Sequence, residues 1–225
     1  MFAAQNCTIC AQNKVFVRRS CRSPLWDFDL GFSRGLTGRL AGVDEAGVGP
    51  LAGPVVAAAV IFYRDRFVEG LNDSKKITAR KREELFWPIV RNALFGIGVV
   101  DEHEIDSINI YQASRLAMRR AVLNLPHTPE FLLVDGRIKI DLPLSQKAIV
   151  KGDGQSASIA AASILAKVYR DAWMCHLDQL YPQYSFHQHK GYGTKLHMAS
   201  LKRCGPSPVH RRSFAPVAAL CGAKA

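Results

Sequence analysis

The hydrophobic residues of this chain lie in short runs that are separated by glycine, proline and charged residues. Two β-type runs, at 40–43 and 54–62, flank a glycine-rich turn and predict two strands of one sheet. Further runs predict strands over 95–100, 131–134 and 148–150. All of these runs are far shorter than the roughly 20 apolar residues of a membrane-spanning helix. The pattern therefore indicates a globular protein without a membrane span.

Helical patterns fill the intervals between the predicted strands. Thr78 can cap a helix in which Pro88 would cause a break or a kink. Residues 107–125 have an amphipathic pattern, whereas 155–180 is apolar on all sides, as expected of a helix packed against a sheet. After a loop-like stretch, a last helix is predicted over 195–203. Because strands and helices alternate, the predicted fold class is α/β.

The composition agrees with a folded protein of moderate size. Of the 225 residues, 48% are hydrophobic and 22% charged, which is enough for one sizeable core or two small ones. This excludes a disordered tail, a collagen and a disulfide-stapled miniprotein. The six cysteines are scattered, which favours a reducing compartment. Cys7 and Cys10 form a single C-x2-C with no second pair at finger spacing, so a structural zinc is the less favoured interpretation.

The charge is strongly positive. Lysine and arginine total 30 against 19 acidic residues, a formal net charge of +11 without one long basic block. Polyanions are natural partners of such a chain, although a merely soluble basic protein is the alternative. Residues 1–38 contain no acid before Asp27 and predict a poorly ordered basic extension. A transit peptide or an upstream start codon would also explain this composition.

The stretch 46–53 is rich in glycine and invites comparison with nucleotide-binding loops. Its glycines lack the G-x-G-x-x-G spacing, and no G-K-[ST] follows them, so a dinucleotide or P-loop fold is not expected. Glycines do allow backbone N–H groups to approach a sugar or phosphate closely, because no side chain intervenes.

Two carboxylates, Asp44 and Glu45, stand at the end of the first predicted strand. Adjacent strand residues point to opposite faces, so both can reach one site only if the chain bends at Ala46 and Gly47. Paired acids at a buried position are costly unless a positive charge neutralises them. A solvent-exposed strand end is the simpler alternative.

Two further predicted strands are each followed by an acid. Asp135 follows 131–134, and Asp153 follows 148–150 at the threshold of the longest helix. Asp135 can instead belong to a turn with Gly136, and Asp153 can be a helix N-cap. Together, however, the acids at three strand ends of one sheet indicate a ligand site. Carboxylates without histidine or cysteine ligands suit Mg²⁺ or Mn²⁺.

Several motifs in order carry a resemblance over residues 40–217. They are Ala-Gly-Val-Asp-Glu-Ala-Gly from 41, Leu-Ala-Gly-Pro-Val-Val from 51, Asn-Asp-Ser-Lys from 72, Val-Asp-Gly from 134, Lys-Gly-Asp from 151, Ser-Ile-Ala-Ala-Ala-Ser-Ile-Leu-Ala-Lys from 158, His-Lys-Gly-Tyr-Gly-Thr from 189 and His-Arg-Arg-Ser-Phe from 210. In these motifs the chain resembles bacterial ribonuclease HII, the type 2 ribonuclease H. The resemblance implies a ribonuclease H-like mixed sheet flanked by helices, formed by 39–225 with a small C-terminal helical segment.

The resemblance also implies a function. It implies an endonuclease that cleaves the RNA strand of RNA/DNA hybrids, and single ribonucleotides embedded in duplex DNA, with two Mg²⁺ or Mn²⁺ ions and products that carry 5′-phosphate and 3′-hydroxyl ends. The implied catalytic and metal-binding acids are Asp44, Glu45, Asp135 and Asp153. Asp171 also matches the family pattern, with a supporting or packing role beside Arg170. A cytoplasmic monomer that binds no membrane is expected.

The implied substrate-binding residues come from three motifs: Gly47, Val48, Gly49, Ser74, Lys75 and Tyr192. Tyr192 would pack against the sugar of the deoxynucleotide that follows the ribonucleotide. One departure stands out, because the family has an arginine where this chain has Val48. The alternative hypothesis is therefore a non-catalytic or junction-impaired relative that binds RNA/DNA hybrids. Since all four acids are present, weakened substrate binding is expected rather than loss of metal chemistry.

Overall fold

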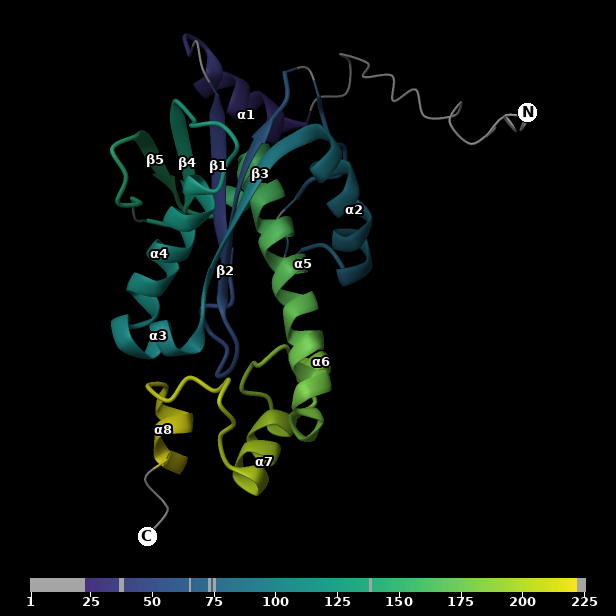
Figure 1. The fold of residues 1–225 in the computed structure, drawn as a ribbon. Helices are drawn as coiled ribbons and strands as arrows, with labels where there is room; N and C mark the ends of the chain where they lie inside the picture. The colour runs from purple at the N-terminus through teal and green to yellow at the C-terminus, as the bar shows by residue number, and fades with distance from the viewer. Residues whose placement is uncertain are drawn as a thin grey trace, which may run out of the picture.

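The computed structural model describes residues 23–36, 39–64, 66–72, 74, 76–137 and 139–221. Its centre is a five-stranded sheet with strand order β3-β2-β1-β4-β5. The strands are β1 (Leu40–Ala46), β2 (Val55–Phe62), β3 (Ala93–Val100), β4 (Phe131–Asp135) and β5 (Ser145–Ile149). β1, β4 and β5 are parallel to one another, whereas β2 is antiparallel to both of its neighbours. The predicted mixed sheet flanked by helices is confirmed (Figure 1).

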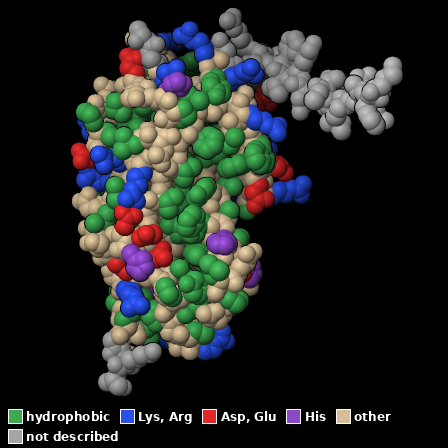
Figure 2. Space-filling view, in the orientation of Figure 1, with side chains coloured by type: hydrophobic (Ala, Val, Ile, Leu, Met, Phe, Trp, Pro, Cys, Tyr) green, Lys and Arg blue, Asp and Glu red, His purple; other side chains and the backbone are tan. Residues whose placement is uncertain are grey.

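Helices cover both faces of this sheet and extend beyond it. They are α1 (Pro24–Ser33), α2 (Ala79–Asn92), α3 (Glu102–Ile108), α4 (Ile110–Leu123), α5 (Ala157–Leu180), α6 (Phe186–His189), α7 (Lys195–Cys204) and α8 (Ala215–Cys221), with short 3-10 turns η2 (Gly152–Gly154) and η3 (Pro182–Tyr184). None of the described helices is long and apolar enough to cross a membrane. Lys and Arg side chains are spread over the face drawn in Figure 2 and do not gather there into one patch.

Two hydrophobic layers hold the helices to the sheet. α4 packs on one face against residues such as Val43, and α5 packs on the other face together with α2. Glycines in the strands allow these contacts to be close. A Cβ at Gly42 would lie 2.1 Å from the backbone of Ser158 in α5, and one at Gly98 would lie 2.0 Å from the carbonyl of Ala117 in α4. The backbones of α5 and α4 therefore approach the strands closely at these glycines, where no side chain intervenes.

Three local predictions differ from the structure. The amphipathic segment 107–125 is two helices, because the backbone turns at Asn109 (φ 67°), whose side chain accepts the N–H groups of Tyr111 and Gln112. Pro88 does not end α2, which continues to Asn92. The predicted loop between α5 and α7 also contains η3 and α6.

The predicted N-terminal extension contains a packed helix. In α1, the Trp26 ring is buried against Phe62, with 4.5 Å between the ring centroids, and its Nε1 donates to the carbonyl of Val68. Asp29 is also buried and accepts the backbone N–H and the hydroxyl of Ser158, both at 2.8 Å. Residues 23–36 thus differ from a poorly ordered leader, since long-range contacts order them. Residues 1–22 and 37–38 lie outside the described part of the chain.

The C-terminal helices form a small cluster beyond one end of the sheet, whereas α1 lies at the other end (Figure 1). Tyr184, Phe186 and Leu201 form the apolar centre of this cluster with Leu51 from the loop after β1. His210 forms a β-bridge with Ala52 in the same loop. The helical C-terminal segment is thereby attached to the loop that follows β1.

Candidate active site

The acids predicted from the sequence lie at one edge of the sheet. Val43 of β1 is aligned with Val134 of β4, so Asp44 and Asp135 occupy the next positions of two parallel strands and point to the same face. Asp153 lies in η2, directly after β5, which is the next parallel strand. The carboxyl ends of three adjacent parallel strands therefore meet at this edge, a position where α/β sheets bind ligands.

Asp44 is the most strongly perturbed of these acids. It is buried, and this burial raises the pKa of its carboxyl well above the usual range, with further increases from the negative charges of Glu45 and Asp135. Hydrogen bonds from Ser163 and from the backbone N–H of Glu45 (2.7 Å) act in the opposite direction. A buried carboxylate whose pKa is raised by neighbouring acids is stabilised by a bound cation.

A short hydrogen bond connects two of the strand ends. Asp135 Oδ1 accepts the backbone N–H of Gly152 at 2.6 Å, which orients the Asp135 carboxyl and holds the turn that carries buried Asp153. Lys151, just before this turn, has a left-handed backbone (φ 56°). A Cβ at Gly152 would lie 2.6 Å from Ile159 Cδ1 and 3.3 Å from Asp135 Oδ1. A side chain at Gly152 would therefore displace the end of Ile159 and crowd the Asp135 carboxylate.

Glu45 faces the opposite side of β1 from Asp44, as the pleat requires. It lines a pocket of about 270 Å³ together with Asp135, Val48 and residues of α4. Cationic side chains from α4 and from the segment after β4 complete this pocket: Arg115, Arg137 and Lys139. Asp135 lines this pocket, and its negative charge also raises the pKa of Asp44. The acids on the two faces of β1 therefore lie at the same end of the strand. The chain turns after Ala46, at Gly47 with φ +97°, as predicted.

The glycine-rich loop and the Tyr192 loop lie beside each other. A Cβ at Gly49 would lie 3.7 Å from the Tyr192 ring, and the N–H of Leu51 donates to the carbonyl of Gly191 at 2.8 Å. Val48 is 39% exposed and Tyr192 is 44% exposed. Two of the three predicted substrate-binding motifs thus form one accessible surface next to the acids.

The third motif is placed differently. Ser74 is buried, and its hydroxyl lies 2.7 Å from the hydroxyl of Ser163, which in turn hydrogen-bonds to Asp44. The Ser74 side chain is therefore directed at the acids through Ser163, and its hydroxyl is not open to a ligand. Lys75 lies outside the described residues.

Asp171 does not lie with the four acids. Its carboxylate accepts from Lys167 Nζ at 2.6 Å, one turn earlier on α5, and Lys167 Nζ lies 6.0 Å from the centroid of the Tyr192 ring. The Lys167 pKa is lowered, mainly by burial, while the hydrogen bond to Asp171 acts in the opposite direction. Asp171 is thus placed to hold Lys167 near Tyr192.

The donor set at the strand ends suits a hard divalent cation. All four side chains offer only carboxylate oxygens, which are the ligands that Mg²⁺ and Mn²⁺ prefer. Within the described part of the chain, no three acidic, histidine or cysteine side chains are already arranged to hold a metal ion. The residue types and their positions at the strand ends fit a metal ion. The observation behind this fit is the repulsion of Asp44 by Glu45 and Asp135, which a bound cation would relieve.

Comparisons with known proteins give the family. The ribonuclease HII family model matches residues 41–217. The chain is 57% identical to ribonuclease HII of Geobacillus kaustophilus over 180 residues, which cover 80% of this chain and 69% of that protein. It is 53% identical to the Geobacter sulfurreducens ribonuclease HII, covering 84% of this chain and 88% of that protein.

The chain belongs to the ribonuclease HII family. It is therefore a ribonuclease H enzyme, as predicted. The fold agrees: the crystal structure of ribonuclease H2 from Pyrococcus horikoshii OT3 superimposes with a TM-score of 0.68 at 26% identity, covering 81% of this chain and 96% of that one.

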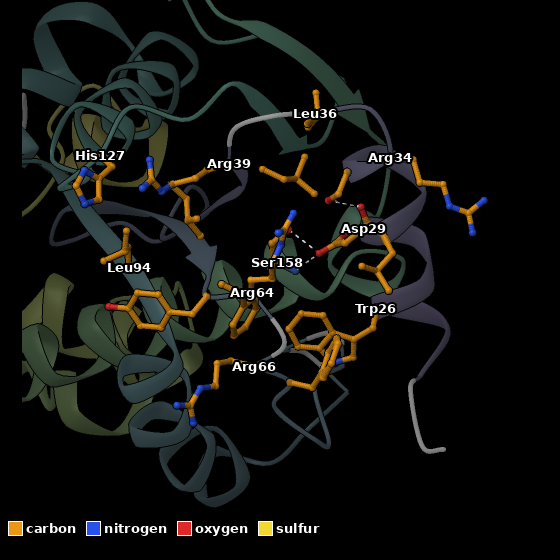
Figure 3. A pocket seen from close by; sticks show the side chains of 17 residues that line it. Trp26, Asp29, Arg34, Leu36, Arg39, Arg64, Arg66, Leu94, His127 and Ser158 are labelled. Atoms are coloured by element: carbon orange, nitrogen blue, oxygen red, sulfur yellow. Dashed lines mark hydrogen bonds between the residues drawn. The ribbon is translucent and has the colours of Figure 1, made fainter. Parts of the chain in front are cut away.

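A second pocket of this ribonuclease HII family member is lined by none of the four acids (Figure 3). It has a volume of about 870 Å³ and lies between α1 and the starts of β1 and β3. Arginines surround it, yet Arg34 and Arg66 point away from Asp29 on different sides of the pocket (Figure 3). Glu45 and Asp135 thus line the pocket of about 270 Å³, whereas the pocket of about 870 Å³ holds none of the predicted acids.

Several residues without a predicted site role contact the loops beside the acids. Arg211 donates to the carbonyls of Gly47 and Val48 at 2.6 and 3.0 Å, and His210 and His197 lie behind the Tyr192 loop. Arg211 and His210, like Ser163, fall within motifs that the family resemblance quotes, whereas His197 lies three residues after one of them. Their roles depend on contacts between distant segments, so the motifs alone did not reveal them.

Proposed function

We propose that this enzyme cleaves the RNA strand of RNA/DNA hybrids and single ribonucleotides embedded in duplex DNA by metal-dependent hydrolysis. The observation that carries the proposal is the meeting of Asp44, Glu45, Asp135 and Asp153 at the ends of parallel strands, with the pKa of Asp44 raised by burial and by its acidic neighbours. A negative site of this kind repels a nucleic acid unless cations are bound. It therefore fits a reaction in which cations and substrate bind together.

The four acids would hold the ions, with Mg²⁺ or Mn²⁺ as the candidates. When bound, such ions supply Lewis acidity: they lower the pKa of water and stabilise the leaving oxygen of the phosphodiester. The protein's own contribution is orientation. Ser163 hydrogen-bonds to Asp44, and the N–H of Gly152 fixes Asp135, so both carboxylates are held before the substrate arrives.

The substrate would lie over the Gly47–Gly49 loop and Tyr192. Arg211 holds the carbonyls of Gly47 and Val48, which fixes the peptide planes of the loop. Because the nucleophile would be water, the 2′-hydroxyl of the ribonucleotide serves recognition and not attack. The expected products carry 5′-phosphate and 3′-hydroxyl ends. The cytoplasmic location and the monomeric state of the enzyme stay predictions.

Val48 motivates the second candidate, a hybrid-binding relative with impaired cleavage at the junction. An arginine at this position would offer a phosphate contact that valine cannot make, and charged hydrogen bonds of this kind contribute roughly 1.5 to 3 kcal/mol. In this chain Arg115 lines the same pocket as Val48 and Glu45. We propose that Arg115 supplies a positive charge for a substrate phosphate from the α4 side, which favours an active enzyme.

The decisive experiment is cleavage of an end-labelled DNA duplex with one ribonucleotide, in Mg²⁺ or in Mn²⁺, with Asp135→Asn as the inactive control. Cutting on the 5′ side of the ribonucleotide, absent with Asp135→Asn, would support the proposal. Cleavage of long hybrids alone would indicate a junction defect at Val48. Binding of both substrates without cleavage would establish the hybrid-binding alternative.

A further inference from the structure

Three histidines are buried behind the Tyr192 loop and have no part in the acid cluster. His189 belongs to α6, His197 to α7, and His210 to the segment that pairs with Ala52. Their side chains are 8%, 0% and 1% exposed. The His189 and His197 rings are stacked, with 4.4 Å between centroids and 14° between planes. Buried imidazoles this close together require a defined set of hydrogen bonds.

The hydrogen bonds of His210 and His197 form one chain whose direction is determined at both ends. The backbone N–H of Ser207 can only donate, and it donates to His210 Nδ1 at 3.0 Å, with the Ser207 hydroxyl 2.7 Å from the same nitrogen. At the other end, the carbonyl of Tyr192 can only accept, and it lies 2.9 Å from His197 Nδ1. The two Nε2 atoms lie 3.0 Å apart between these ends.

Only one arrangement of protons satisfies all of these contacts. Since His210 Nδ1 accepts, His210 carries its proton on Nε2 and donates it to His197 Nε2. His197 then carries its proton on Nδ1 and donates it to the carbonyl of Tyr192. The two neutral histidines must therefore be opposite tautomers. Burial lowers the pKa of both imidazoles, that of His210 to about 3, which agrees with neutral rings.

His189 holds the other side of the same loop. The N–H of Gly191 donates to His189 Nδ1 at 3.2 Å, so His189 Nε2 carries the proton and donates to the carbonyl of Tyr184 at 2.8 Å. The peptide groups on both sides of the Tyr192 Cα are thus fixed, because the N–H of Tyr192 donates to the carbonyl of His189 at 2.9 Å.

A metal site does not explain this cluster. Two nitrogens bound to one tetrahedral zinc ion lie roughly 3.3 Å apart, as follows from Zn–N distances near 2.0 to 2.1 Å, whereas the two Nε2 atoms are 3.0 Å apart. In addition, both Nδ1 atoms already have hydrogen-bond partners. No group of three such side chains in the described ranges fits a metal ion.

We propose that Ser207, His210 and His197 are positioning residues that fix the carbonyl of Tyr192 and thereby hold its ring where the substrate binds. This inference rests on the proposed function, because that function gives the Tyr192 ring its role. Tyr192 is 44% exposed and lies beside Gly49, so a large part of its surface has no protein packed against it. The chain of hydrogen bonds through His210 and His197 holds the Tyr192 loop on its buried side.

The first test needs no activity. ¹⁵N NMR of the uniformly labelled full-length protein at pH 7.5 distinguishes protonated from unprotonated ring nitrogens. We expect His197 protonated on Nδ1 and His210 on Nε2. Equal tautomers for the two histidines, or charged rings, would overturn the proposal whether or not the enzyme cleaves ribonucleotides.

The second test separates positioning from general stability. His210→Phe breaks the chain of hydrogen bonds, whereas His210→Gln retains a hydrogen-bond donor. The matched control is His176→Gln, on the exposed face of α5. For a duplex with one ribonucleotide, His210→Phe should raise KM roughly 3- to 10-fold, the loss of one net hydrogen bond, with a smaller change in kcat. His210→Gln should recover part of this loss, and His176→Gln should match the wild type.

The same substitution in a Tyr192→Ala background completes the test. If His210 acts through Tyr192, His210→Phe should add no further rise in KM there. Equal rises in both backgrounds would refute the positioning role. Wild-type protein that cleaves neither substrate would refute the proposed function instead, while the NMR result would still decide the proton arrangement.

Discussion

Two of the regions with buried charge, the strand ends and the loops beside them, accommodate it in opposite ways. At the strand ends, Asp44 is surrounded by other carboxylates, and burial together with Glu45 and Asp135 raises its pKa well above the usual range. Behind the adjacent loops, Arg170 and Arg211 are 0% exposed, yet each donates to three backbone carbonyls. Burial lowers their pKa values to about 10 and 9, so both stay charged at neutral pH.

The difference separates a binding site from its scaffold. Carbonyl oxygens already satisfy the charges of Arg170 and Arg211, so these residues fix the loop 47–54 and do not need a ligand. The carboxylates repel one another, so the same fold retains an unfavourable interaction that a cation would remove. Stability and function therefore make different demands on neighbouring buried charges.

The largest expected effect comes from neutralising the carboxylate cluster. Asp44→Asn should lower kcat more than about 100-fold, because losing even an outer partner of a metal ligand costs about 10- to 100-fold. In EDTA, the same variant should melt a few degrees higher than wild type, since it removes repulsion with Glu45 and Asp135. A gain of about 1 kcal/mol corresponds to about 2–4 °C for a protein of this size.

Calorimetry in EDTA and in Mn²⁺ would measure this effect. Mn²⁺ should raise the Tm of the wild type and leave that of Asp44→Asn nearly unchanged. A lower Tm for Asp44→Asn than for the wild type in EDTA would contradict the claim that the acids repel one another, because Asp44 would then contribute to stability.

Removing the buried charge of Arg211 should lower stability, in contrast to the gain expected for Asp44→Asn. Arg211→Met leaves the carbonyls of Gly47, Val48 and Gly53 without their donor, and should destabilise the fold by about 3 kcal/mol or more. Arg211→Lys should not restore stability, because one ammonium cannot reproduce the forked guanidinium. Arg212→Met, at an exposed neighbour, is the control. Urea unfolding monitored by circular dichroism would report the differences, and equal stability of the two methionine variants would contradict this account.

An arginine without a full set of carbonyl partners should behave as a ligand-binding cation. Arg115 Nη1 donates to Gln112, and its buried Nε has no hydrogen-bond partner among the described residues. Arg115→Ala should weaken hybrid binding roughly 10-fold, within the range of a charged hydrogen bond. Fluorescence anisotropy in EDTA would measure this, with exposed Arg119→Ala, one turn further along α4, as the control. Equal affinities for both variants would remove Arg115 from the substrate path.

The smallest expected effect adds a charge. Val48→Arg places a guanidinium at an exposed position on the rim of the same pocket, and should raise kcat/KM for a single ribonucleotide a few-fold. The dependence of KM on salt should steepen by roughly one counterion. No gain in kcat/KM would mean that the cations of the α4 side already supply what Val48 lacks.

Much of the chemistry could be predicted from the sequence alone. Local patterns determine the strands and the long helix, because side-chain periodicity and turn residues are properties of neighbouring positions. The residue types of the four acids predict a hard-cation site, since carboxylates without nitrogen or sulfur ligands prefer such ions. The family motifs determined the reaction class.

Only the tertiary structure decided how these parts act on one another. The register of β1 on β4 aligns Asp44 with Asp135, and the packing of α5 turns Ser74 inward onto Ser163 instead of toward a substrate. Long-range packing also orders α1, although the composition of residues 1–38 predicts a poorly ordered extension. The proton arrangement of His197 and His210 likewise required the partners at both ends of the chain of hydrogen bonds. Such contacts join residues distant in sequence, and the periodicity of a single segment carries no information about what packs against it.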